Sequence, residues 1–253
     1  MPTILPAELS LPLKKASEAI APETIVTVTT AATAPVAEID TWIFDLDNTL
    51  YPASSNLFAQ VSIRITQFIA HYLGIDLDEA KRVQRRYFTE HGTTLRGLMT
   101  NHALDPAEFL AFVHDIDLTV LPPAQALDRA LTGLAGRKLV FTNGSTRHAE
   151  RILEHLGLDR HFSGIFDIAA AGYLPKPDPS GYDLLIERFG VTAGRAAMVE
   201  DMAKNLAPAH GLGMTTVWVR TTNDWAIDGS TEPHVHHTTD DLPGWLTAWT
   251  ARG

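Results

Sequence analysis

The sequence contains no cysteine among its 253 residues. This absence excludes thiol nucleophiles, thiolate metal sites and disulfide bonds, and it fits a reducing compartment. The chain also lacks an apolar run long enough to span a bilayer. Lys14 and Lys15 follow the first apolar stretch, whereas a secretory signal would place its basic residues ahead of that stretch. We therefore expect a cytoplasmic protein that does not act at a membrane.

Positive charge is scarce as well. The chain has 20 Lys and Arg against 30 Asp and Glu, which gives a formal net charge of −10. Because no basic stripe offsets this balance, the composition argues against binding of a nucleic acid polymer. An anionic small molecule would have to be attracted locally, by a metal ion or a few placed cations. The 45% hydrophobic content is enough for one large α/β domain or a domain with an insertion, whereas the oligomeric state stays open.

Short apolar runs alternate with amphipathic segments from residue 39 onward. We predict buried strands at 41–44, 138–142, 196–199 and 215–219, and helices that end at Gly157, run from about 179 to 190, and cover 203–210. Repeated β–α units of this kind indicate a parallel sheet. Residues 1–38 are rich in Ala, Thr, Pro and Val without a sustained period, so we expect a disordered leader; a partner-binding arm or an edge strand at 25–28 is the alternative.

One stretch interrupts the alternation. Between residues 54 and 121 we find no strand candidate but four helical ones, at 57–72, 77–91, 94–102 and 105–116. Asp105-Pro106 with Glu108 is typical of a helix start. We therefore expect an all-helical cap at 54–121, inserted into an α/β core formed by residues 39–53 and 122–253.

Polar residues gather just past the predicted strands. Because the carboxyl ends of parallel strands meet at one edge, where open sheets bind their ligands, we expect these residues to lie together. Carboxylates from the first and last groups would chelate Mg²⁺, while a hydroxyl, backbone N–H groups and a lysine would bind an anion. The combination predicts a phosphoryl-transfer site, and its members in chain order are Asp45, Asp47, Thr142, Asn143, Lys176, Glu200 and Asp201.

The order of these groups resembles the haloacid dehalogenase superfamily: D-x-D-x-T in "FDLDNTLYP", then T-N, a lysine before a proline, and paired acids. The resemblance covers about residues 39–221. It implies a Rossmann-like parallel sheet with helices on both faces, and a Mg²⁺-dependent phosphatase that forms an aspartyl-phosphate. Asp45 would attack phosphorus, and Asp47 would protonate the leaving oxygen and later deprotonate water. The transport ATPases of this superfamily carry threonine at the second position and its dehalogenases usually lack an acid there, so the acid at Asp47 favours phosphate chemistry.

The same resemblance assigns the remaining site residues. Thr142 and Lys176, with Asn143 beside them, would hold the phosphoryl oxygens. The metal would be bound by the Asp45 carboxylate, the backbone carbonyl of Asp47 and the Asp201 carboxylate, with Glu200 acting through a water molecule. Asn205 is either an orienting residue for these ligands or a polar residue in a first helical turn.

A narrower resemblance rests on "WIFDLDNTLYP", "HGTTLRGLM" and "VFTNGSTRHAERILEHLG", which look like the pyrimidine 5′-nucleotidase branch. It implies a pyrimidine nucleoside 5′-monophosphate as the substrate. Among the cap residues we expect His91, Thr93, Thr94 and Arg96 to contact the base or ribose. A phosphatase or phosphomutase acting on another small metabolite, such as a sugar phosphate or phosphoglycolate, is the alternative, and a non-catalytic binding protein is the third reading.

The histidines outside these groups give no clear indication of a metal or substrate site. His102 and His148 are expected to be solvated or structural residues. His234, His236 and His237 lack the spacing of a helical metal site and are expected in a surface loop.

Overall fold

Six parallel strands form the centre of the computed structural model, which describes residues 39–221 and 226–252. The strands are β1 (Thr41–Phe44), β2 (Arg137–Phe141), β3 (Gly164–Phe166), β4 (Ala196–Glu200), β5 (Thr215–Val219) and β6 (His237–Thr239). Their order across the sheet is β3-β2-β1-β4-β5-β6, and every neighbouring pair is parallel. This is the Rossmann order, in which the connection reverses between β1 and β4. The predicted fold class is confirmed.

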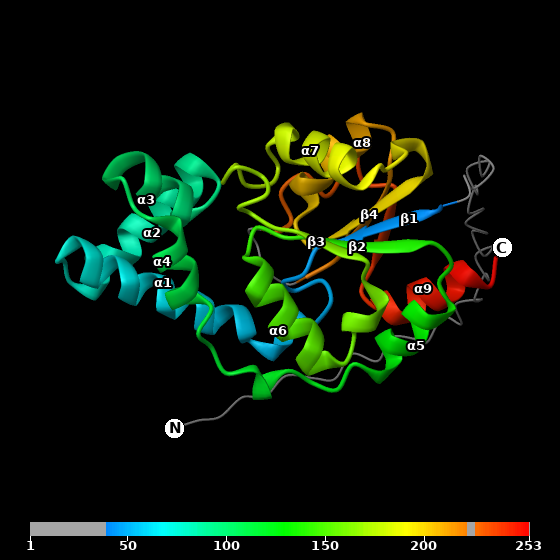
Figure 1. The fold of residues 1–253 in the computed structure, drawn as a ribbon, viewed down its shortest axis with the longest axis horizontal. Coiled ribbons are helices and arrows are strands. Elements are labelled where there is room, and N and C mark those ends of the chain that lie inside the picture. The colour runs from blue at the N-terminus through cyan, green and yellow to red at the C-terminus, as the bar shows by residue number, and fades with distance from the viewer. Residues whose placement is uncertain (1–38, 222–225, 253) are drawn as a thin grey trace, which may run out of the picture. The chain divides into compact units, whose positions relative to one another are not determined.

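Helices cover both faces of the sheet (Figure 1). Side chains alternate along β1, so that Trp42 and Phe44 pack into one hydrophobic cluster and Ile43 into another. The first cluster includes residues of α5 (Gln125–Gly133), α6 (Thr146–Leu156) and α9 (Leu242–Thr250). The second includes residues of α7 (Pro179–Phe189) and α8 (Leu206–Gly211). Because β1, β2, β4 and β5 are buried on both faces, each of these four strands reads as a short apolar run.

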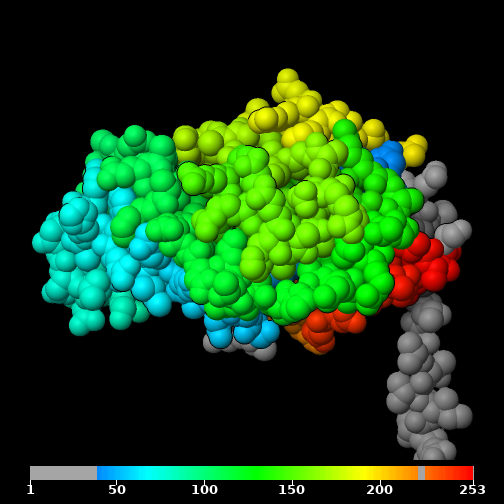
Figure 2. All heavy atoms as spheres, turned by 60° about the horizontal axis from the view of Figure 1, so that its bottom comes forward, coloured from blue at the N-terminus to red at the C-terminus, as the bar shows by residue number. Residues whose placement is uncertain are grey.

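The segment after β1 is helical, as predicted. It contains α1 (Leu57–Leu73), α2 (Leu77–His91), α3 (Thr94–His102) and α4 (Pro106–Val113), with short 3₁₀ turns at Ala53–Ser55 and Leu118–Val120. The side chain of Asp105 caps α4 by accepting a hydrogen bond from the Ala107 N–H. In Figure 2 the atoms of these helices, coloured cyan to green, gather in one lobe beside the sheet domain. We propose that residues 54–121 act as a cap over the core.

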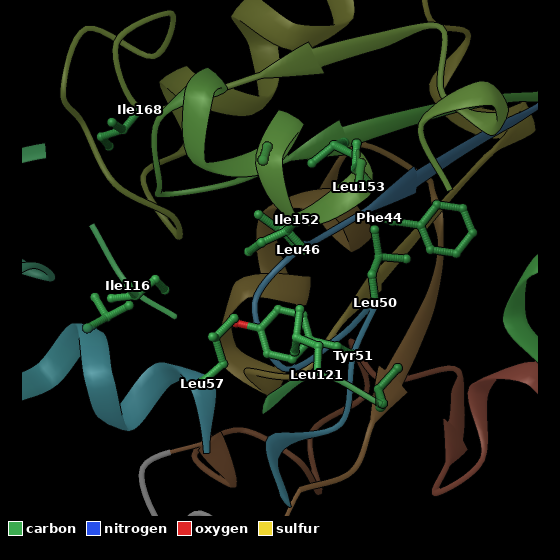
Figure 3. Packing of buried hydrophobic residues seen from close by; sticks show 14 of the residues in the cluster. Phe44, Leu46, Leu50, Tyr51, Leu57, Ile116, Leu121, Ile152, Leu153 and Ile168 are labelled. Atoms are coloured by element: carbon green, nitrogen blue, oxygen red, sulfur yellow. The ribbon is translucent and has the colours of Figure 1, made fainter. Parts of the chain in front are cut away.

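The two ends of this helical segment are packed against the first strand and its turn. Leu46, Leu50 and Tyr51 follow β1 and belong to the same buried cluster as Leu57 and Leu121, as Figure 3 shows. Each of these side chains is at most 6% exposed. The helical segment is therefore joined to the core by apolar contacts at the point where the chain enters and leaves it.

Several elements differ from the sequence-based expectation. β3 and β6 are each three residues long and were not predicted, and neither were α5 and α9. The predicted helix at 203–210 begins as a 3₁₀ turn, Ala203–Asn205, before α8. The expectation that His234, His236 and His237 lie in a loop is wrong for His237, which begins the edge strand β6.

Two further expectations concern other parts of the chain. The leader at 1–38, with its possible strand at 25–28, lies outside the described residues. Among the helices in the described ranges, none is both long and apolar enough to cross a membrane.

Candidate active site

The predicted site residues lie at the carboxyl edge of the sheet, beside the reversal between β1 and β4. Asp45 directly follows β1, and its N–H donates to the Val199 carbonyl on β4 (2.9 Å). Glu200 is the last residue of β4, and Thr142 directly follows β2. The strand topology thus brings together residues as far apart in the chain as Asp45 and Glu200. This is the position at which open parallel sheets bind their ligands.

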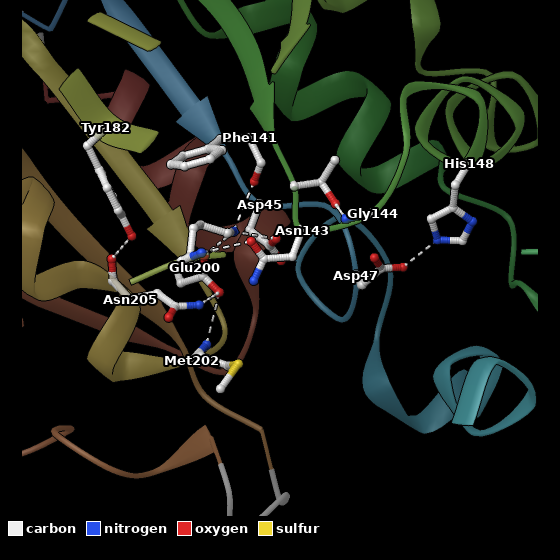
Figure 4. A network of polar contacts seen from close by, with 12 residues as sticks. Asp45, Asp47, Phe141, Asn143, Gly144, His148, Tyr182, Glu200, Met202 and Asn205 are labelled. Carbon is white, nitrogen blue, oxygen red and sulfur yellow. Dashed lines mark hydrogen bonds and ion pairs between the residues drawn. The ribbon is translucent and has the colours of Figure 1, made fainter. Parts of the chain in front are cut away.

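A buried lysine links two of the carboxylates, Asp45 and Glu200, which Figure 4 labels. Lys176 Nζ donates to Asp45 Oδ1 (2.7 Å), to Glu200 Oε2 (2.6 Å) and to the backbone carbonyl of Phe141 (2.9 Å). Asp201 completes the group, because Asp45, Glu200 and Asp201 each offer an oxygen within 4.8 Å of the others. All of these side chains are buried. One lysine therefore lies among three buried carboxyl groups.

This imbalance of charge shifts the pKa values of the acids. Burial and the charge of Glu200 raise the pKa of Asp45 to about 7, although Lys176 acts in the opposite direction. Burial and the charges of Asp45 and Glu200 raise the pKa of Asp201 well above its usual value. Burial lowers the pKa of Lys176, but the two carboxylates bonded to it outweigh burial and raise that pKa. A divalent cation would remove the repulsion among the three acids.

Two buried oxygen atoms beside this group have no hydrogen-bond partner among the described residues. They are Asp201 Oδ2 and Asn205 Oδ1. Orphaned acceptors in a buried site are costly unless a cation or water completes them. The Asn205 side chain is held from its other end, because Nδ2 donates to Glu200 Oε1 (3.2 Å). The oxygen donors, their burial and their unmet acceptors fit a hard cation such as Mg²⁺.

Asp47 lies in a different environment from Asp45. Its Oδ1 accepts hydrogen bonds from the Tyr51 hydroxyl (2.6 Å) and from His148 Nε2 (2.9 Å). Burial raises the pKa of Asp47, but the charge of His148 and the two hydrogen bonds outweigh burial and lower it to about 2. Asp47 is therefore a carboxylate near neutral pH. His148 was expected to be a solvated or structural residue, and at 2% exposed it is not solvated.

Sequence reasoning missed the contact between His148 and Asp47. The two residues are 101 positions apart, and the histidine comes from the first turn of α6. The only sequence signal is the position of His148 three residues after Ser145, which caps α6. That spacing places the imidazole on the first helical turn after the Thr142-Asn143 motif, close to the site edge of the sheet.

Thr142, Asn143 and the Lys176 loop are bonded to one another. Thr142 Oγ1 accepts the Gly144 N–H (2.9 Å), and Asn143 Oδ1 accepts the Lys176 N–H (2.9 Å). These bonds use acceptor atoms, so the Thr142 hydroxyl hydrogen and the Asn143 Nδ2 group stay available as donors. Both residues line the same cavity as Asp45 and Asp47. The predicted anion-binding donors therefore face the same space as the predicted nucleophile.

That cavity has a volume of about 360 Å³ and lies between the sheet edge and helices α1, α2 and α4. Its wall on the helical side is mostly apolar and includes Phe58, Val61, Phe88 and Leu110. The turn between α2 and α3 closes one side, since Gly92, at φ +80°, lies where a Cβ would be 3.2 Å from the Pro175 side chain. The space is large enough for a small organic ligand.

The polar residues of the cap divide into two groups. Thr93 and Thr94 line the cavity, whereas His91 and Arg96 are not among its lining residues. Contact of any of these four residues with a base or ribose stays a prediction, which the cavity lining favours for Thr93 and Thr94. Two cations that sequence reasoning missed do line the cavity: Arg85 on α2, and Lys204, whose Nζ lies 5.7 Å from the centre of the Phe88 ring.

Comparison with known families identifies this arrangement. Residues 39–213 match the haloacid dehalogenase-like hydrolase family. The chain belongs to this family. The match includes all seven residues predicted for the site, from Asp45 to Asp201.

Relatives within the haloacid dehalogenase-like hydrolases include phosphatases. The chain is 30% identical over 189 residues to phosphate metabolism protein 8 of Saccharomyces cerevisiae, covering 68% of this chain and 59% of that protein. It therefore spans less than two thirds of the length of that relative. It is 27% identical over 192 residues to glyceraldehyde 3-phosphate phosphatase of Methanocaldococcus jannaschii, covering 69% of this chain and 82% of that enzyme.

A solved structure supports the same fold. The crystal structure of a HAD phosphatase from Thermococcus onnurineus matches with a TM-score of 0.58 and 19% identity, over 83% of this chain and 98% of that one. At this identity the likeness concerns the fold alone. Haloacid dehalogenase-like hydrolases typically use Mg²⁺, and the buried group of Asp45, Glu200 and Asp201 could bind such an ion here.

Proposed function

We propose that this hydrolase cleaves phosphate monoesters through an aspartyl-phosphate on Asp45. In the first half-reaction an oxygen of the Asp45 carboxylate bonds to phosphorus and the ester P–O bond breaks. Asp47, a carboxylate in the free site, takes the acidic proton of the bound phosphate monoester monoanion and passes it to the leaving oxygen. In the second, Asp47 takes a proton from water, the water oxygen bonds to phosphorus, and the acyl-phosphate bond breaks. Inorganic phosphate leaves with the proton that Asp47 took from water, and both Asp45 and Asp47 return as carboxylates.

The observation that carries this proposal is the buried group of Asp45, Lys176, Glu200 and Asp201 on the floor of the cavity. In this function Asp45, Asp201 and the backbone carbonyl of Asp47 would hold Mg²⁺, which would neutralise charge on the phosphoryl group. Glu200 has both carboxylate oxygens engaged by donors, so its part is to hold Lys176 and to contact the metal through water. Thr142, Asn143 and Lys176 bind the phosphoryl oxygens.

We propose pyrimidine nucleoside 5′-monophosphates as the substrates. The size of the cavity and its apolar wall support this choice, because a nucleoside leaves more apolar surface to bury than a small hydroxy acid does. Thr93 and Thr94, at the start of α3, supply polar groups on the same wall. In this reading the wall residues bind the leaving group and the sheet edge binds the phosphate.

A second candidate substrate class is a small phosphate ester with another anionic group, such as phosphoglycolate. The observation that favours it is the pair of cations, Arg85 and Lys204, on the cavity wall. A carboxylate two or three bonds from the phosphate could contact such groups. The relative that hydrolyses glyceraldehyde 3-phosphate, according to its name, supports a small ester but not an acidic one.

A panel of phosphate monoesters tests both readings. We would measure kcat/KM with and without Mg²⁺ for p-nitrophenyl phosphate, uridine and cytidine 5′-monophosphates, a sugar phosphate, phosphoglycolate and glyceraldehyde 3-phosphate. We expect Mg²⁺-dependent turnover of the nucleotides at the highest kcat/KM. A preference for phosphoglycolate would replace the nucleotide assignment, and absence of turnover on every ester would contradict the phosphatase assignment itself.

A further inference from the structure

Two donors converge on a single oxygen of Asp47. The Tyr51 hydroxyl and His148 Nε2 both donate to Oδ1, at 2.6 Å and 2.9 Å. Within the described ranges, Oδ2 of the same carboxylate accepts no hydrogen bond, and the Asp47 side chain is 17% exposed to the cavity side. Figure 4 shows the Asp47 carboxylate turned toward His148, apart from the Asp45 group. One oxygen is therefore held by the protein, and the other is free to carry a proton.

His148 is itself held from two sides. The His114 ring stacks on it with centroids 4.0 Å apart and an angle of 12° between the planes. His114 Nδ1 is hydrogen-bonded to Ser145 Oγ (3.1 Å), and Ser145 caps the helix that carries His148. Arg151 of the same helix donates to the His114 carbonyl (2.7 Å). The imidazole therefore has a fixed orientation, set jointly by α6 and by the residue that follows α4.

We propose that His148 and Tyr51, supported by His114, are positioning residues that orient Asp47 for proton transfer to and from substrate. This inference rests on the proposed function, because Asp47 has a proton to transfer only if the chain cleaves an ester. Two donors on Oδ1 remove the freedom of the carboxylate to rotate and leave Oδ2 as the oxygen that carries the proton. Fixing a proton donor before the reaction lowers the entropy that must be lost at the transition state.

The chain offers a matched comparison for a merely structural role. His161 Nε2 also donates to an aspartate, Asp128 Oδ1, at 2.7 Å. The side chain of His161 is 9% exposed, so it too is largely buried. Neither His161 nor Asp128 lines the active-site cavity. Loss of this pair tests what breaking a histidine–aspartate contact does to stability alone.

The test uses two esters of similar size, p-nitrophenyl phosphate and benzyl phosphate, on the full-length protein with Mg²⁺. The nitrophenolate leaves without help from an acid, whereas the benzyl alkoxide needs a proton. For His148→Ala we expect kcat to fall about 100-fold on benzyl phosphate and less than about 5-fold on p-nitrophenyl phosphate. Tyr51→Phe, which removes only the hydroxyl, should change the ratio of the two rates in the same direction by about 10-fold.

A conservative replacement and the matched control complete the experiment. The side-chain amide of Gln reaches about as far as Nε2 of histidine, so His148→Gln should recover most of the benzyl phosphate rate lost in His148→Ala. His161→Ala should leave the ratio of the two rates unchanged. If His148→Ala does not fold, the ratio of the two rates in Tyr51→Phe, which is expected to change by about 10-fold, decides the question.

Three results would overturn the inference. One is an equal loss on both esters in His148→Ala and Tyr51→Phe, and another is a change of ratio in His161→Ala as large as in His148→Ala. The third is an unchanged ratio in every variant that folds. Failure of the proposed function looks different, because the wild-type protein would then hydrolyse neither ester, and the inference would be withdrawn with it.

Discussion

Asp45 and Asp47 are two residues apart in the chain, yet they lie in opposite surroundings. Asp45 faces two other carboxyl groups and a shared lysine, and burial together with the charge of Glu200 raises its pKa to about 7. Asp47 faces an imidazole and a phenol, and their effect outweighs burial and lowers its pKa to about 2. Neighbouring acids whose pKa values are pushed apart typically have different roles in one reaction.

The difference shows which side of the site is complete. The Asp47 side is balanced by the protein's own donors, whereas the Asp45 side carries more negative charge than Lys176 can offset. A bound cation would therefore offset excess charge on the Asp45 side only. Each side can be altered separately, and the two kinds of change should affect activity and stability in different ways.

The largest effect is expected from Asp45→Asn. An amide cannot attack phosphorus and contributes no charge to a metal, so kcat on p-nitrophenyl phosphate should fall by at least about 10⁴-fold. Thermal unfolding should show that the variant is folded. Metal-dependent turnover by the purified variant, with wild-type contamination excluded, would contradict the assignment of Asp45 as the nucleophile.

The second effect is expected from Asp47→Asn, which removes the proton carrier and keeps the shape. We expect a loss of about 10²- to 10⁴-fold in kcat on benzyl phosphate. On p-nitrophenyl phosphate the first half-reaction should be partly spared, so that a burst of nitrophenolate precedes slow turnover. Stopped-flow absorbance measures the burst, and equal losses on both esters without a burst would speak against Asp47 as the general acid.

Much of the core and its site was predictable from local pattern. Residues 41–44 and 215–219 form strands as predicted, because they are apolar runs with clear ends. The rule that ligands bind beyond the carboxyl ends of parallel strands then placed Asp45, Thr142 and Glu200 together. β3 and β6 were missed because three residues are too few to show a period, and β6 contains only His237, Thr238 and Thr239.

The partners of each site residue were not predictable in the same way. The contact of His148 with Asp47 depends on how α6 packs against the turn after β1, and no periodicity in the sequence encodes that angle. Arg85 and Arg96 show the same limit. Both are basic residues on cap helices, and only the packing of α2 and α3 decides that Arg85 lines the cavity and Arg96 does not.

A third effect concerns stability and the raised pKa of Asp45. Because this pKa lies above its usual value of 3.8, the metal-free folded protein binds more protons than the unfolded chain between about pH 4 and pH 7. Its free energy of unfolding should therefore fall as the pH rises through that window, by about 4 kcal/mol at most. Urea unfolding with a chelator present, at several pH values, measures this slope.

The control for this effect is Asp45→Asn, in which the slope should be smaller. Mg²⁺ should raise the free energy of unfolding of the wild-type protein, by about 2.7 kcal/mol at 100 times its Kd, and more at pH 8 than at pH 5. Asp201→Asn should weaken this response. A wild-type protein whose stability does not respond to Mg²⁺ at any pH would contradict a metal site on the Asp45 side.

The smallest effect separates two arginines of the cap, Arg85 and Arg96. Arg85 lines the cavity and has no bonded partner among the described residues, so Arg85→Ala should lower kcat/KM for an anionic or nucleotide substrate. An exposed charge is worth at most about 1 kcal/mol, which corresponds to about a fivefold loss. Arg96→Ala is the matched control, because it removes the same side chain from a neighbouring helix outside the cavity wall, and it should leave kcat/KM within the error of measurement.

p-Nitrophenyl phosphate should respond to neither substitution, since its leaving group offers the wall little to contact. If Arg96→Ala reduced nucleotide turnover and Arg85→Ala did not, the leaving group would bind on another side of the cap, and the part of the cavity between α1 and α2 would have no role in choosing the substrate.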